Sequence, residues 1–160
     1  GDGQDPAVAA MPALLFVYGT LKEGFPNFAL NAGRRLGGLY RTRQPFPLYV
    51  VQLGNEERAP WLMDNAGAGH QVVGQVFAVD DGALAAMDHF EEVGLPTGYV
   101  SAEVELEPVE TAEVASVASG VVRAQVYLKP AQELPRCLVV EGPFAEYTVA
   151  LAQGYRLSIA

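Results

Sequence analysis

Residues 14–22 read LLFVYGTLK, in which five apolar or aromatic residues lead into a Gly-Thr pair before the pattern turns polar. An apolar run this short and without alternation is typical of a strand buried on both faces. Gly19 falls where that strand should end, and a glycine there allows a positive φ and a close approach by a ligand. Successive N–H groups in such a turn can bind a carboxylate or a developing oxyanion. The alternative is a core strand followed by an ordinary turn.

The bulk composition favours a folded, acidic protein. The chain has 160 residues, of which 50% are hydrophobic, so a substantial core is expected. A net charge of −9 argues against nucleic-acid phosphates and anionic membranes as partners. The single cysteine, Cys137, excludes an internal disulfide and fits a reducing compartment. We therefore expect a cytoplasmic protein, and we expect it to be a monomer.

The first ten residues differ from the rest of the chain. Residues 1–10 lack the basic region and apolar core of a signal peptide, and Met11 stands immediately before the first expected strand. We expect residues 1–10 to be an appended or disordered extension, and residues 11–160 to form one domain. No apolar run approaches the ~20 residues that a membrane-spanning helix needs.

Short strand patterns recur along the whole chain. Residues 54–58 are interpreted as a polar turn, residues 108–120 as a variable hairpin connection, and residues 144–152 as a short helix. Many short strands with scattered short helices predict an α+β fold, built on a small β-barrel with the helices packed outside. The expected later strands are residues 37–42, 46–51, 60–63, 72–79, 99–106 and 121–128.

One helix is expected from about residue 82 to residue 93, after an N-cap supplied by Asp80 or Asp81. Glu91 falls on the border of its apolar face, whereas Glu92 should lie in solvent. A carboxylate against apolar neighbours has its charged form disfavoured, which raises its pKa and suits a general base near neutral pH. The alternative is a border glutamate with a solvated carboxylate. The apolar face is expected to consist of Ala83, Leu84, Met87 and Phe90.

Several motifs occur in an order that resembles one known family. The first is YGTLK at residues 18–22, followed by Gly24 and by Pro26 and Asn27. In this order the motifs resemble the γ-glutamylcyclotransferase-like proteins, and most closely their γ-glutamylamine cyclotransferase branch. The resemblance is good over about residues 11–104 and loose beyond. The other motifs are PFPL at 45–48, PWL at 60–62, GQVFAVD at 74–80, and the stretch from Leu84 to MDHFE at 87–91.

The resemblance implies a β-barrel with a cavity at one end and a catalytic glutamate at Glu91. It implies a small γ-glutamyl substrate and neither a metal nor a cofactor. The family usually has an arginine two residues after Tyr99, where this chain has Ser101, so the role of that arginine is filled differently here or is absent. Trp61 could equally wall the pocket or pack in the core. The expected substrate-binding residues are Tyr18, Gly19, Thr20, Leu21, Trp61 and Tyr99.

The residues fit a simple reaction of the type that the resemblance implies. Two scattered histidines and one cysteine do not suggest a metal site, and no phosphate-binding or dinucleotide motif is present. One carboxylate and a set of backbone donors suit an intramolecular attack, in which the α-amine of a γ-glutamylamine closes on its γ-carbonyl. The products are 5-oxoproline and a free amine.

The sequence is compatible with more than one set of substrate contacts and with more than one function. The turn could hold the oxyanion, the α-carboxylate or both, and Lys22, Arg34 or Arg35 could meet a substrate carboxylate. The substrate could instead be a γ-glutamyl amino acid. From other functional classes, the chain could be a non-catalytic carboxylate-binding module or a protein that acts through its acidic surface.

Overall fold

The structure is a computed structural model that describes residues 13–54, 56–109 and 121–157. The expected extension at residues 1–10 and all but the start of the expected connection at 108–120 lie outside these ranges. Five strands close into a barrel, and β1 completes it by pairing antiparallel with β5 and parallel with β7. In barrel order the strands are β1 (Ala13–Val17), β5 (Val73–Val79), β2 (Arg34–Thr42), β6 (Val100–Pro108) and β7 (Val122–Leu128).

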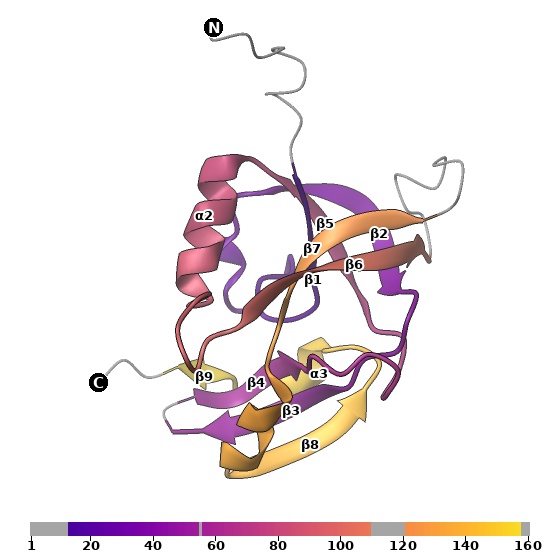
Figure 1. Cartoon of the computed structure of the whole chain (residues 1–160). Helices are drawn as coiled ribbons and strands as arrows, with labels where there is room; N and C mark the ends of the chain where they lie inside the picture. The colour runs from indigo at the N-terminus through magenta and orange to yellow at the C-terminus, as the bar shows by residue number, and fades with distance from the viewer. Residues whose placement is uncertain (1–12, 55, 110–120, 158–160) are drawn as a thin grey trace, which may run out of the picture.

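A second sheet of four strands lies below the barrel in Figure 1, and helix α2 runs along one side of the barrel. The predicted small barrel with short helices outside it is therefore confirmed, whereas the second sheet was not predicted. Its strands, in sheet order, are β8 (Val139–Phe144), β3 (Leu48–Leu53), β4 (Glu56–Leu62) and β9 (Arg156–Leu157). The helices are η1 (Phe28–Leu30), α2 (Asp81–Phe90), η2 (Ala131–Arg136) and α3 (Val149–Ala152).

Two local predictions were wrong, and both errors fall in this second sheet. The polar stretch at residues 54–58 was expected to be a turn, but β4 begins at Glu56 and pairs with both β3 and β9. The helix expected at residues 144–152 is limited to α3, because the chain up to Phe144 pairs with β3 as strand β8. In both places, pairing with distant strands outweighs the local preference of the residues.

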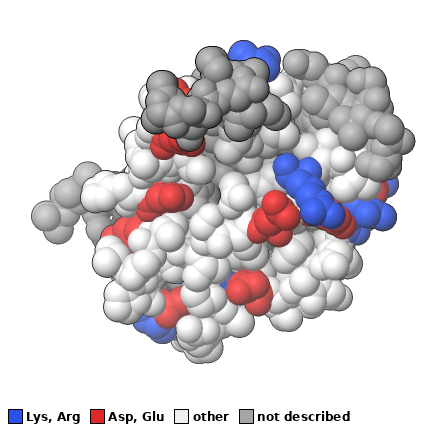
Figure 2. All heavy atoms as spheres, turned by 45° about the horizontal axis from the view of Figure 1, so that its top comes forward, with Lys and Arg blue, Asp and Glu red and all other residues white. Residues whose placement is uncertain are grey.

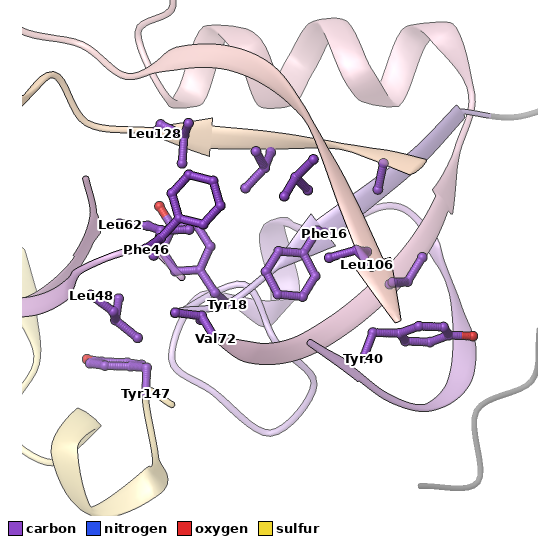
Figure 3. Close-up of a cluster of buried hydrophobic side chains, with 14 of the residues drawn as sticks. Phe16, Tyr18, Tyr40, Phe46, Leu48, Leu62, Val72, Leu106, Leu128 and Tyr147 are labelled. Atoms are coloured by element: carbon purple, nitrogen blue, oxygen red, sulfur yellow. The ribbon is translucent and has the colours of Figure 1, made fainter. Parts of the chain in front are cut away.

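One hydrophobic cluster joins the barrel to the second sheet. Figure 3 shows it running from Tyr40 past Phe16 and Tyr18 to Leu48 and Tyr147. Phe16 and Tyr40 come from barrel strands, whereas Leu48 belongs to β3 in the second sheet. The barrel and the sheet therefore share a core, which fixes their relative position.

Strand β1 is buried on both faces, as its sequence predicted. Phe16 belongs to the cluster inside the barrel, whereas Leu15 and Val17 belong to a second cluster that includes Met87 of α2. Leu15 and Phe16 are each 1% exposed. Because neighbouring side chains of a strand point to opposite faces, β1 connects the barrel interior to the layer under the helix.

The surface charges are dispersed. On the face drawn in Figure 2, acidic side chains form separate small groups, and several lie beside Lys or Arg side chains. Two examples on barrel strands are Arg41 with Glu107 at 2.6 Å and Arg123 with Glu105 at 3.4 Å. Exposed pairs of this kind add little to stability.

Gly19 is constrained in a way that differs from the expectation. It is absent from the residues with a positive φ, so an unusual backbone conformation does not explain this glycine. A Cβ built on Gly19 would lie 2.6 Å from Cγ of Pro60 in β4. The glycine is therefore needed because the second sheet packs directly against the turn that follows β1.

We predict that Gly19→Ala lowers the free energy of unfolding by ~1–3 kcal/mol, because the added methyl group overpacks the contact with Pro60. Gly82→Ala in α2 is the control: its Cβ would meet nothing closer than Oδ1 of Asp80 at 3.6 Å. A gain of up to about 1 kcal/mol is expected there from helix propensity. Urea unfolding of both variants tests this, and equal stability of Gly19→Ala and the wild type would contradict it.

Candidate active site

A cavity of about 410 Å³ lies where the end of β1 faces the second sheet and the C-terminal end of α2. This volume falls within the range of small-molecule sites. Its lining includes Glu91 and all but one of the expected substrate-binding residues, the exception being Trp61. The expected residues that the cavity brings together are Tyr18, Gly19, Thr20, Leu21, Glu91 and Tyr99.

The turn after β1 presents a row of backbone donors at the cavity wall. The carbonyl of Gly19 accepts from the N–H of Lys22 at 3.1 Å, and that of Thr20 accepts from Asn27 at 2.8 Å. Within the part of the chain that the structure describes, the N–H groups of Gly19, Thr20 and Leu21 donate to no protein acceptor. The turn is thus held by its carbonyls while its consecutive N–H groups remain available to a ligand, as an anion site requires.

The side chain of Asn27 holds this turn in place with hydrogen bonds. Its amide nitrogen donates to Oγ1 of Thr20 and to the hydroxyl of Tyr155, both at 3.0 Å. Asn27 and Tyr155 both line the cavity. The C-terminal part of the chain is therefore bonded to the turn through one amide group.

Glu91 is the residue at which α2 ends, rather than a residue inside a longer helix. The helix stops at Phe90 instead of near Val93, because Glu92 adopts a left-handed φ of 58°. The N–H of Glu92 then donates to His89, and the N–H of Val93 to Asp88, which is the bonding pattern of a Schellman motif. The backbone of Glu91 is consequently held at the cavity.

Other features of this helix agree with the sequence in part. The side chain of Asp80 accepts from the N–H of Ala83, so the predicted N-cap is confirmed. Met87 is buried, whereas Phe90, expected on the apolar face, is 37% exposed and lies at the cavity.

The environment of Glu91 favours its neutral form. Burial raises the pKa of the Glu91 carboxyl to about 8, with the carboxylates of Glu56 and Glu92 acting in the same direction and the ammonium of Lys129 opposing them. The C-terminal end of a helix carries partial negative charge, which adds to this effect. A pKa near neutrality is what a general base needs to exchange protons with a substrate.

Three tyrosines brace the cavity walls with hydrogen bonds. The hydroxyl of Tyr18 donates to the carbonyl of Tyr127 at 2.7 Å, and that of Tyr127 donates to the carboxylate of Asp88 at 2.6 Å. The hydroxyl of Tyr99 donates to the carbonyl of Pro60 at 3.3 Å. Burial raises the pKa of all three phenols, so they remain protonated donors. They connect β1, β7, α2 and β4 around the cavity.

Trp61 lies outside the cavity lining and is 1% exposed. Its ring instead supports Lys129, whose Nζ lies 4.7 Å from the Trp61 ring centroid and 4.4 Å from that of Tyr99. Of the two alternatives for Trp61, the structure places it in a buried cluster and not in the cavity lining. Trp61 reaches the site indirectly, by positioning a lysine on its ring face.

The basic residues named from the sequence are placed elsewhere. Lys22 is 2% exposed and donates to the carbonyl of Tyr147 at 2.6 Å, and Arg35 forms an ion pair with Glu23 at 3.0 Å. Neither they nor Arg34 line the cavity.

The position of the missing family arginine gives no cation either. Ser101 is exposed, and its hydroxyl bonds to the side chain of Gln125. Among the described residues that line the cavity, Lys129 is the one lysine or arginine.

Sequence reasoning missed Glu56 and Lys129, which both line the cavity. Glu56 was hidden because its polar surroundings were interpreted as a turn. Lys129 had a usable signal: Arg123, Gln125 and Tyr127 are spaced two apart along β7, and the same spacing continues to Lys129. The side chains of Tyr127 and Lys129 are both buried at the cavity end of this row.

The described residues contain no group of three or more His, Cys, Asp or Glu side chains placed to hold a metal ion. They also contain no helix with the length and apolar character needed to cross a bilayer.

Comparison with known proteins identifies the family. The family model described as "Gamma-glutamyl cyclotransferase, AIG2-like" matches residues 15–146. The human gamma-glutamylaminecyclotransferase is 42% identical over 84 residues, covering 49% of this chain and 53% of that protein. The rat protein of the same name is 35% identical over 103 residues, covering 61% of this chain and 66% of that protein.

A solved structure extends the likeness to nearly the whole chain. The crystal structure of an AIG2-like protein from Mus musculus matches with a TM-score of 0.73 and 29% identity, covering 94% of this chain and 97% of that one. In sequence, the matched region spans between about half and two thirds of the curated human and rat relatives. The family match over residues 15–146 and the shared barrel together show that the chain belongs to the γ-glutamyl cyclotransferase, AIG2-like family.

Proposed function

We propose that the protein is a γ-glutamylamine cyclotransferase, which converts the γ-glutamyl group of a substrate such as ε-(γ-glutamyl)-lysine to 5-oxoproline and releases the amine. The observation that carries this proposal is that Glu91, with its raised pKa, shares a cavity with the unpartnered N–H groups of Gly19 to Leu21. The name of the curated human and rat relatives supports the same activity.

Ring closure depends above all on holding the substrate in a folded conformation. The α-amine attacks the γ-carbonyl of the same molecule, so the nucleophile is already tethered. Well-oriented intramolecular attack is worth effective molarities of roughly 10⁵–10⁸ M. The N–H groups of the turn hold the α-carboxylate, the developing oxyanion or both, and Tyr18 and Tyr99 wall the site.

Glu91 moves the proton. Its carboxylate takes a proton from the attacking α-amine and returns it to the leaving nitrogen, so that no net proton is consumed. A carboxyl with a pKa of about 8 is well matched to both transfers. General acid–base catalysis of this kind contributes roughly 10²–10⁴-fold to the rate.

A γ-glutamyl amino acid is the second candidate substrate, because Lys129 places one cation at the cavity. The single cysteine fits a cytoplasmic location, and we propose that the protein acts there as a monomer on a small-molecule substrate.

We predict that Glu91→Gln lowers kcat by at least ~10²-fold while the fold is retained, because the amide keeps the shape and cannot accept the proton. Glu57→Gln is the control, since Glu57 follows Glu56 on β4 but pairs with Arg156 outside the cavity. Glu92 is unsuitable as a control because it lines the cavity. The rate of 5-oxoproline formation is the measurement, and near-normal turnover by folded Glu91→Gln would overturn the mechanism.

The raised pKa of Glu91 predicts the direction of the pH profile. Catalysis needs the deprotonated carboxylate, so kcat/KM should fall about tenfold per pH unit as the pH drops below about 8. A flat profile between pH 5 and pH 8 would contradict this.

The same group affects stability in the opposite direction. A carboxyl whose pKa is higher in the folded state stabilises the protein below its unfolded pKa of 4.5, and this contribution is lost as the pH rises through about 8. Glu91→Gln should therefore gain stability relative to the wild type between these two pH values. Unfolding of both proteins in urea at pH 5 and pH 8.5 measures the difference.

We predict that kcat/KM is higher for ε-(γ-glutamyl)-lysine than for γ-glutamyl-alanine. The alanine derivative brings its second carboxylate within a bond or two of the reacting amide, in a cavity that Glu56, Glu91 and Glu92 also line. A desolvated and unpaired charge there is costly. Steady-state kinetics with both substrates decides the matter, and a ratio at or below one would sink this substrate assignment while leaving ring closure intact.

A further inference from the structure

Two charged side chains of the cavity have no part in the proposed ring closure by Glu91 and the turn at Gly19. Glu56 begins strand β4 on the second sheet, and Lys129 directly follows β7 of the barrel. They line the same cavity as Glu91 but come from different sheets.

The carboxylate of Glu56 lacks a partner. Within the described residues, no hydrogen bond and no ion pair within 4.0 Å involves this carboxylate, although the side chain is half-buried. The next residue, Glu57, points to the other face of β4, where it pairs with Arg156 at 3.9 Å. A carboxylate that is partly removed from water without a partner is unfavourable, and a cationic ligand group would relieve that cost.

Lys129 is a buried ammonium that forms no ion pair with the described residues. Its side chain is 7% exposed, and its ammonium donates one hydrogen bond, to the carbonyl of Thr97 at 2.7 Å. The rings of Trp61 and Tyr99 fix its position, and no carboxylate of the described residues lies within 4.0 Å. An ammonium carries three donors, so this buried cation can still bind a carboxylate.

The two groups lie close enough to influence one another. Burial raises the pKa of Glu56, and Lys129 is the largest opposing influence. Burial lowers the pKa of Lys129, and Glu56 is again the largest opposing influence. A carboxylate and an ammonium that form no ion pair within 4.0 Å among the described residues, in one cavity, match a ligand that carries an ammonium and a carboxylate on the same carbon atom.

We propose that Glu56 and Lys129 bind the α-amino-acid group of the leaving amine, with Glu56 contacting its ammonium and Lys129 its carboxylate. This inference rests on the proposed cyclotransferase activity and defines its substrate class. The preferred leaving group is the side-chain amine of a free amino acid with both α-groups uncapped. Simple alkylamines, diamines and lysine residues inside peptides are poorer leaving groups.

Four γ-glutamyl amides of the same chain length test the proposal. Lysine carries both charged groups, 1,5-diaminopentane keeps the ammonium alone, 6-aminohexanoate keeps the carboxylate alone, and n-pentylamine has neither. Each lost charged group should reduce kcat/KM of the wild type about 10- to 100-fold, the range for a hydrogen bond to a charged group. Wild-type kcat/KM for the pentylamine derivative equal to that for the lysine derivative would overturn the proposal.

Variants assign the two contacts separately. Glu56→Gln should lower kcat/KM about 10- to 100-fold for the lysine and diaminopentane derivatives relative to the other two. Lys129→Met should lower kcat/KM for the lysine and aminohexanoate derivatives relative to the other two. Glu57→Gln, on the opposite face of β4, should change none of the four.

The ratios between substrates make the test specific. Glu56 and Lys129 both influence the pKa of Glu91, so either variant can alter all four rates together, but such a change cancels in the ratios. Equal losses on all four substrates in both variants would show a structural role and overturn the proposal. If Lys129→Met does not fold, Glu56→Gln and the wild-type panel still decide. If 5-oxoproline forms from the pentylamine derivative, the cyclotransferase activity stands even where the proposed roles of Glu56 and Lys129 fail. If none of the four derivatives yields 5-oxoproline, both the cyclotransferase activity and the proposed roles of Glu56 and Lys129 are overturned.

Discussion

The burial of β1 on both faces is the constraint on which the rest of the structure depends. Its pairing with β5 and β7 closes the barrel, and its two side-chain rows enter two different hydrophobic clusters. One cluster extends to the second sheet, and the other includes Met87 of α2. The turn at Gly19 and the end of α2 at Glu91 are therefore both positioned from a single strand. A loop-borne site would lack this rigidity.

The burial of Glu91 has a cost in folding free energy that other interactions must offset. The raised pKa of Glu91 means that ionising it opposes folding, and Glu92 next to it occupies a left-handed φ that a glycine would adopt more easily. Strain and unfavourable burial at neighbouring positions are common where a site must be preorganised. Here the tyrosine hydrogen bonds and the Schellman bonds hold that arrangement in place.

The sequence predicted the features that depend on local pattern. The buried strand at residues 14–17, the N-cap at Asp80 and the barrel with outer helices all follow from periodicity and turn chemistry, and the structure contains them. Features set by distant pairing were not predictable in this way. Glu56 lies at the cavity because β4 pairs with β3 and β9, whereas Trp61 of the same strand packs in a buried cluster beside Lys129. The reason for Gly19 was likewise tertiary, since Pro60 is distant in sequence.

The cavity is lined by charges of both signs, whereas the protein as a whole has a net negative charge. The net charge of −9 argues against anionic partners at the surface, but surface charges are screened within about 10 Å at ordinary ionic strength. Groups inside the cavity are screened much less, so Glu56, Glu91, Glu92 and Lys129 dominate what a ligand experiences. Their arrangement is not uniformly negative, because a buried ammonium lies among three carboxyl groups. Selectivity among leaving amines should therefore depend on the positions of the charged groups within the amine, rather than on the net charge of the amine.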